Sequence, residues 1–146
     1  MSDDLDRFVA AQDRVWPQVV SELAAGAKRS HWMWFVFPQV AGLGRSAMAV
    51  RYALGSVEEA AAYLAHPVLG ARLRQATDLM LAHAGTPAEA LLGGIDAVKF
   101  RSSMTLFRAA APEDARFDRA LAAFFGGEPD PRTLELLGDA SYTRFC

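Results

Sequence analysis

The sequence predicts an all-α protein: one compact multi-helix domain over residues 1–146, with about seven helices and little or no sheet. Apolar residues recur along most of the chain at the spacing of an amphipathic helix. Residues that cap helices stand in front of several of these stretches. One run, 32–37, is short and apolar enough to be a strand, but no second run could pair with it, so a helix is favoured there as well.

The N-terminal part of the chain predicts two helical segments. An apolar stripe is formed by Leu5, Phe8, Val15 and Val19. Pro17 predicts either a kink or the restart of a helix, and Gly26 predicts its end.

Later helices are predicted from caps and stripes. Ser56 with Glu59, and Thr86 with Glu89, match the capping box, and Asp96 and Asp130 are N-cap candidates. His66 precedes a proline at a helix start and is expected to act as a cap or turn residue. The buried stripes are predicted to be Leu69, Leu73, Ala76 and Met80 (ended by Gly85); Phe100, Met104 and Phe107; Phe117, Leu121, Phe124 and Phe125; and Leu134 with Leu137.

Composition and charge exclude several classes of protein. With 52% hydrophobic and 22% charged residues the chain is typical of a globular protein. A net charge of -2 argues against a general nucleic-acid binder, and no apolar run approaches the ~20 residues that cross a bilayer. The lone Cys146 excludes an intrachain disulfide and is expected to be exposed. We expect a cytoplasmic protein without a cofactor or metal; its oligomeric state stays open.

The chain has 13 arginines but only two lysines, Lys28 and Lys99. Because a compact ammonium group is not interchangeable with a guanidinium group, the two lysines are candidates for chemistry. Two ordinary surface lysines are the alternative.

The densest group of candidate residues lies in segment 28–39. Trp32 and Trp34 offer faces on which a base could stack, and His31 titrates near neutrality and could act as an acid or a base. The alternative is a central core helix in which His31 is a hydrogen-bonded core residue. For Phe35, Val36 and Phe37 the core interpretation is preferred.

Residues 42–47 spell G-x-G-x-x-A, which taken literally is a dinucleotide-binding fingerprint. The absence of further βαβ units argues against that interpretation. A glycine turn before a helix capped by Ser46 could still hold an anion, with Arg45 beside it. A flexible loop with a good N-cap is the alternative.

The segment 96–107 places Lys99, Ser102 and Ser103 on one helical face. The hydroxyl groups predict either helix–helix hydrogen bonds or the polar wall of a pocket. Lys99 could bind a phosphate or a carboxylate, and a surface lysine beside structural serines is the alternative. Metal-ligand spacing is absent among the histidines, and a set of Ser103, His31 and Asp96 carries little weight without geometry.

The strings SHWMWFVFPQ at 30–39 and SSMTLF at 102–107, with further matches at 42–46, 59–73, 96–99 and 125–134, resemble the bacterial DUF1810 family, sometimes mislabelled calpastatin. The resemblance covers essentially the whole chain and implies a mainly helical domain with no established activity. Phe100 departs from the smaller aliphatic residue expected there, as a core substitution.

The Lys99-Phe100 pair and the tryptophans are also faintly similar to the NADAR (YbiA-like) group of helical N-glycosidases. That similarity implies a pocket in which a base stacks on Trp32 or Trp34 and a phosphate binds Lys99 and Arg45. Asp96 or His31 would transfer the proton.

Two hypotheses follow. The first is a domain that binds, and if it is an enzyme hydrolyses as an N-glycosidase, a nucleotide-like or ADP-ribose-like molecule between segment 28–46 and helix 96–106. Its candidate catalytic residues are His31, Asp96 and Lys99, and its candidate ligand contacts are Lys28, Trp32, Trp34, Gln39, Arg45, Ser46, Lys99, Ser102 and Ser103. It requires Lys28, His31, Trp34 and Lys99 to converge on one concave surface. The second is a noncatalytic protein-interaction or stress (toxin–antitoxin) accessory domain, which requires His31 and both tryptophans to be buried beside a flat polar patch.

Overall fold

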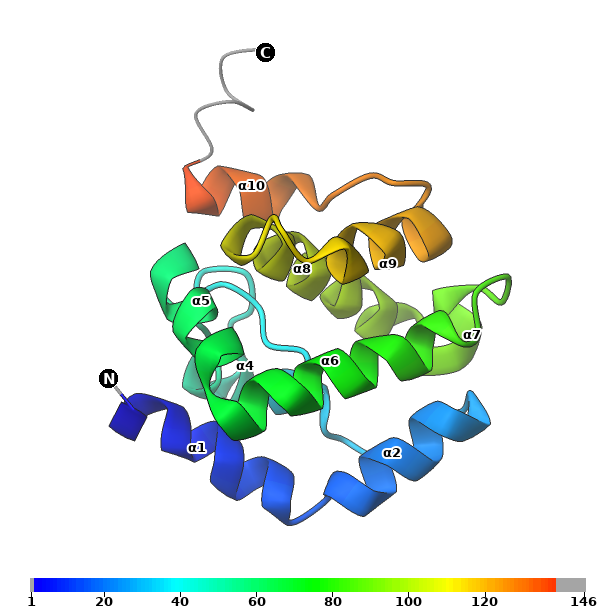
Figure 1. The fold of residues 1–146 in the computed structure, drawn as a ribbon, viewed down its shortest axis with the longest axis horizontal. Helices are drawn as coiled ribbons and strands as arrows, with labels where there is room; N and C mark the ends of the chain where they lie inside the picture. Colours follow the sequence, from blue (N-terminus) through cyan, green and yellow to red (C-terminus); the bar gives the residue numbers. More distant parts are fainter. Residues whose placement is uncertain (1, 139–146) are drawn as a thin grey trace.

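Ten helices and no sheet make up residues 2–138, the part of the chain that the computed structural model describes (Figure 1). In chain order the helices are α1 (Ser2–Asp13), α2 (Trp16–Ala25), α3 (Met33–Val36), α4 (Ala47–Arg51), α5 (Val57–Ala65), α6 (Pro67–Leu81), α7 (Ala88–Leu92), α8 (Gly94–Ala110), α9 (Ala115–Phe125) and α10 (Pro131–Leu137). Seven of them have seven residues or more, so the all-α prediction is confirmed. Cys146 lies outside the described residues.

The helices pack around α6 and α8. α1 and α2 lie along one side of the molecule and α9 and α10 along the other, with α6 and α8 between them (Figure 1). α8 packs against α5, α7, α9 and α10. Phe100 on α8 is fully buried, with its ring centroid 4.9 Å from that of Phe37 in an edge-to-face arrangement. None of the described helices is both long enough and apolar enough to cross a membrane.

The apolar run 32–37 forms a helix, as predicted, but only the single turn of α3. The chain then passes through one isolated parallel bridge between Val40 and Leu54. There Ala41 N donates to Leu54 O at 2.8 Å and Leu54 N donates to Gln39 O at 3.0 Å. Because this bridge pairs the segment after Pro38 with Leu54, α3 does not continue into a longer helix.

Several predicted helix ends are confirmed. Ser56 accepts a hydrogen bond from Glu59 N, and Asp130 accepts one from Thr133 N. His66 Nδ1 caps α6 by accepting from Val68 N and Leu69 N. Pro17 lies in the first turn of a restarted helix, α2, which ends at Gly26 in the left-handed region.

Three predicted helix ends are wrong. Thr86 does not cap α7, because Pro87 occupies the N-cap position and no side chain bonds there. Asp96 is not an N-cap: Gly93, with φ of 93°, lets the chain turn and start α8 at Gly94, so Asp96 lies inside the first turn. α6 ends at Leu81, before Gly85, which lies in the turn that follows.

Candidate functional site

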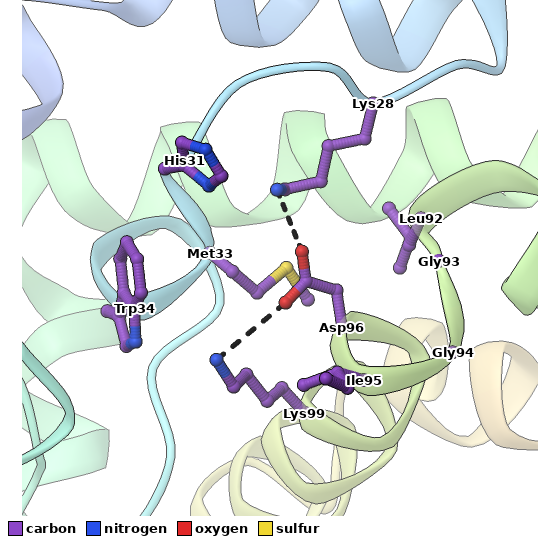
Figure 2. Close-up of a pocket in the computed structure, with 10 residues that line it drawn as sticks. All are labelled: Lys28, His31, Met33, Trp34, Leu92, Gly93, Gly94, Ile95, Asp96 and Lys99. Carbon is purple, nitrogen blue, oxygen red and sulfur yellow. Dashed lines mark ion pairs between the residues drawn. The ribbon is translucent and has the colours of Figure 1, made fainter. Parts of the chain in front are cut away.

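A pocket of about 390 Å³ lies between segment 28–34 and the N-terminal end of α8 (Figure 2). Its volume is within the usual range for small-molecule sites. We call it the lysine pocket, because both lysines of the chain line it. The lining residues are Lys28, His31, Met33, Trp34, Leu92, Gly93, Gly94, Ile95, Asp96 and Lys99.

Asp96 joins the two lysines, which reach it from opposite sides (Figure 2). Its Oδ2 lies 2.7 Å from Lys28 Nζ and its Oδ1 lies 3.7 Å from Lys99 Nζ. The exposed fraction of the Lys28 side chain is 6%, against 22% for Lys99. Two ammonium groups therefore share one carboxylate, which leaves a net positive charge on the three groups.

Each lysine also lies over a tryptophan ring. Lys28 Nζ is 4.9 Å from the ring centroid of Trp32, and Lys99 Nζ is 4.9 Å from that of Trp34. Lys28 Nζ further donates to the Ser30 carbonyl at 2.5 Å. Lys28 is thus held by several partners at once, whereas Lys99 has one long ion pair and one ring. Lys99 is the cation that a ligand could engage with less rearrangement.

Glu22 on α2 holds the segment that carries these residues. Its carboxylate accepts hydrogen bonds from Arg29 N at 2.9 Å, Ser30 N at 3.1 Å and the Trp32 indole N–H at 2.9 Å. It also accepts one from the Ser30 hydroxyl. Burial by itself raises the pKa of Glu22, but these donors outweigh it and lower the pKa to about 2. An ionised, buried carboxylate therefore holds the backbone of Arg29 and Ser30 and the side chains of Ser30 and Trp32.

The sequence analysis missed Glu22, although a signal was present. Val19, Glu22 and Leu23 are all buried and follow the helical spacing of an apolar stripe. A carboxylate on such a stripe needs buried hydrogen-bond donors, which the neighbouring loop provides.

The opposite wall of the pocket is the start of α8. Gly93 and Gly94, which the sequence analysis also missed, allow the sharp turn from α7 into α8. The Lys28 backbone N–H donates to the Leu91 carbonyl at 3.0 Å and joins the two walls. The first N–H groups of a helix have no partner within it, and its N-terminus favours negative charge, so Asp96 is well placed there. In the described part of the chain, no three His, Cys, Asp or Glu side chains gather closely enough to hold a metal ion.

The structure brings together five of the predicted site residues. Lys28, His31, Trp34, Asp96 and Lys99 all line the lysine pocket, with His31 exposed and Trp34 half-buried. This is the convergence that the small-molecule hypothesis requires. The interaction hypothesis expected His31 and both tryptophans to be buried, and only Trp32 is.

The other predicted residues do not line this pocket. Trp32 has no exposed surface and donates to Glu22, so a ligand cannot stack on it. Ser102 bonds to the Val98 carbonyl and to Asp130 Oδ2 at the start of α10. Ser103 is fully buried, and its hydroxyl has no hydrogen-bond partner in the structure. Ser102 therefore faces the start of α10, and Ser103 lies in the buried part of α8.

The predicted wall from residue 35 to residue 46 is also absent from the pocket. Gln39 is half-buried and takes part in the bridge to Leu54 through its carbonyl. Ser46 caps α4 by accepting from Ala49 N at 3.1 Å, and Arg45 beside it is exposed. The chain leaves the pocket at α3, so these three residues lie outside its lining.

Fold and pocket together define a class: a small all-α domain in which two lysines share one carboxylate inside a pocket of small-molecule size. A family model described as "Protein of unknown function (DUF1810)" matches residues 2–137, and the chain belongs to this family, as its resemblance indicated. The crystal structure of the conserved hypothetical protein Rv1873 from Mycobacterium tuberculosis at 1.38 Å is similar, with 51% sequence identity and a TM-score of 0.91 over 92% of this chain and 96% of that chain. Comparison with curated proteins gives no match.

Proposed function

We propose that this domain binds a small anionic, nucleotide-like molecule in the lysine pocket. The observation that carries the proposal is the convergence of the only two lysines in the chain on Asp96, within one concave site. A pocket that retains positive charge and has a partly exposed tryptophan fits a ligand with both an anionic group and a ring.

The anionic group of the ligand binds Lys99. The 3.7 Å ion pair of Lys99 with Asp96 is long, so an anion can take the place of the carboxylate at this ammonium. The shorter 2.7 Å pair with Lys28 keeps Asp96 in place meanwhile. The first residues of α8, Gly94, Ile95 and Asp96, also line the pocket, and the first N–H groups of a helix have no partner within it and can donate to an oxyanion. Trp34, Met33 and Ile95 form the apolar wall beside them.

A hydrolytic form of this proposal assigns two roles. The exposed His31 donates a proton to the leaving base of an N-glycoside, and the carboxylate of Asp96 stabilises the positive charge that develops on the sugar. Water then adds to the sugar carbon as the carbon–nitrogen bond breaks, and it loses one proton to solvent, which balances the proton that His31 gave to the base. Release of free adenine from ADP-ribose, followed by chromatography, tests this step. His31→Ala is expected to abolish the release and to retain binding.

Binding is tested first, by thermal shift with NAD, ADP-ribose, ADP, ribose 5-phosphate and inorganic phosphate. A ligand at about a hundred times its dissociation constant stabilises the fold by ~2.7 kcal/mol, a shift of several degrees. We expect that shift in the wild type and its loss in Lys99→Ala. Arg119→Ala removes one exposed cation from α9 and serves as the matched control, in which the shift is retained. Equal shifts in both variants, or no shift with any of these ligands, would contradict the proposal.

A further inference from the structure

A second concave surface lies between α1, α3 and α4. It has a volume of about 290 Å³, and we call it the arginine groove. Three arginines line it, Arg7, Arg14 and Arg51, and none of its described lining residues is acidic. The rest of the lining is small or apolar: Ala10, Ala11, Val15, Phe35, Met48 and Tyr52. The groove therefore combines an apolar floor with positive charge at its edges.

The three arginines of the groove differ in the contacts that they make. Arg7 donates from Nε to the Arg51 carbonyl at 2.8 Å and from Nη2 to the Ala53 carbonyl at 3.0 Å, which joins α1 to the end of α4. The Arg51 guanidinium lies over the Tyr52 ring, 5.5 Å from its centroid. Arg14 is exposed and has no ion pair or hydrogen bond with the residues that the structure describes. Its neighbour Asp13 is already paired, at 2.8 Å, with Arg72.

The spacing of these groups defines the shape of a ligand. Arg7 contacts the backbone of Arg51, so these two lie at one end of the groove. Arg14, the residue after the end of α1, lies seven residues beyond Arg7, which is a backbone spacing of about 10 Å at the rise of a helix. An extended peptide advances about 3.3 Å per residue, so two acidic side chains about three residues apart can reach both ends.

We propose that the arginine groove binds a short acidic segment of a partner protein. Its apolar side chain packs on the floor formed by Val15, Phe35 and Met48, and two flanking carboxylates pair with Arg14 and Arg51. Arginine is the residue best suited to pairing with carboxylates, through two parallel hydrogen bonds. This inference does not rest on the proposed function of the lysine pocket.

The aromatic residues of the groove favour a peptide over a single-stranded nucleic acid. Binding of a nucleic-acid strand uses exposed ring faces on which bases stack. Phe35 and Tyr52 are each only 7% exposed. Their rings pack edge-on at a centroid distance of 5.3 Å, and Tyr52 also contacts Phe8 at 5.6 Å. The floor thus offers apolar surface but no free ring face.

The test is fluorescence anisotropy with labelled seven-residue peptides. Each has glutamates at the second and fifth positions, and leucine, phenylalanine, isoleucine or methionine at the two positions between. The matched controls replace both glutamates by glutamine. We expect at least one glutamate peptide to bind about tenfold more tightly than its glutamine control, with an affinity that falls as salt rises. A labelled thymidine octanucleotide tests the nucleic-acid alternative.

Variants then locate the interaction. Arg14→Glu and Arg51→Glu are each expected to weaken binding of the glutamate peptide about tenfold or more, whereas Arg119→Glu and Lys99→Ala leave it unchanged. Unaltered melting temperatures show that Arg14→Glu and Arg51→Glu still fold. The proposal is overturned if glutamate and glutamine peptides bind equally or not at all, if neither groove variant weakens binding, or if the oligonucleotide binds more tightly than every peptide.

Discussion

The lysine pocket and the arginine groove both collect positive charge in a protein whose net charge is -2, but they do so in different ways. In the pocket, the ammonium groups share Asp96 and lie over tryptophan rings, so the charge is concentrated at one point. In the groove, no described lining residue is acidic, and the arginines come from separate places: Arg7 from α1, Arg14 from the turn after α1, and Arg51 from the end of α4. A concentrated charge suits one small anion, and a spread charge suits an extended ligand. Two side chains of equal charge thereby define two kinds of site.

The largest expected change in the free energy of unfolding follows from substitution of Glu22, which supports the lysine pocket. Glu22→Gln replaces an acceptor of several hydrogen bonds by an amide that donates, which leaves the buried indole N–H of Trp32 or the partly buried N–H groups of Arg29 and Ser30 without a partner. We expect the free energy of unfolding to fall by on the order of 3 kcal/mol. Urea denaturation measures it, with Glu135→Gln on the exposed face of α10 as the control. A loss as small as that of the control would show that the pocket does not depend on Glu22.

The same carboxylate predicts a dependence on pH. The pKa of Glu22 is lowered in the folded protein from its ordinary 4.5 to about 2. The ionised form is therefore favoured by folding: its contribution is complete above about pH 5 and is lost as the pH falls toward 2. The difference in unfolding free energy between wild type and Glu22→Gln should narrow across this range. A difference that stays constant from pH 6 to pH 3 would contradict this assignment.

The next prediction is that substitutions of the two lysines differ in their effect on the free energy of unfolding. Lys28→Met removes a nearly buried ammonium with an ion pair of 2.7 Å and a carbonyl hydrogen bond of 2.5 Å. We expect a loss of about 2 kcal/mol in unfolding free energy, measured by thermal or urea denaturation. No measurable loss would mean that Lys28 is as loosely held as Lys99.

Lys99→Met is expected to cost less than about 1 kcal/mol, because its ion pair is longer and more exposed. The same substitution is expected to abolish stabilisation by ligand. A destabilisation equal to that of Lys28→Met would remove the distinction between a lysine that holds the pocket and one that binds.

The smallest effect is expected in the groove. Arg14→Ala removes an exposed side chain without a described partner, so the unfolding free energy should change by no more than about 0.5 kcal/mol. Denaturation of this variant beside Lys28→Met provides the direct comparison of the two sites. A larger loss would show that Arg14 supports the fold and is not available to a partner.

The fold was predictable where the determinants are local. Ser56, His66 and Asp130 cap helices as predicted, because a cap depends on two or three neighbouring residues. Asp96 was predicted as a cap and is not one, because the positive φ of Gly93 starts α8 earlier. A glycine permits that conformation without requiring it, so the sequence left the start of α8 open.

Some residues of the lysine pocket could be predicted from the sequence, but which of them are exposed to a ligand could not. The scarcity of lysine drew attention to Lys28 and Lys99, which the structure places in one pocket. Which tryptophan would be buried could not be foreseen, because it depends on the contact of Trp32 with Glu22, ten residues earlier in the chain. Arg45 and Ser46 lie outside the pocket because the chain before them pairs with Leu54 through Val40, and this is again a contact between distant residues.

The placement of both lysines in one pocket has a practical consequence. The chain's only side-chain amines lie within a single cavity, and they differ in exposure, at 6% for Lys28 and 22% for Lys99. Reductive methylation with isotope-labelled formaldehyde would therefore install spectroscopic reporters in this pocket and at no other side chain. Two methylamine signals would follow pocket occupancy directly, without a substitution anywhere in the protein.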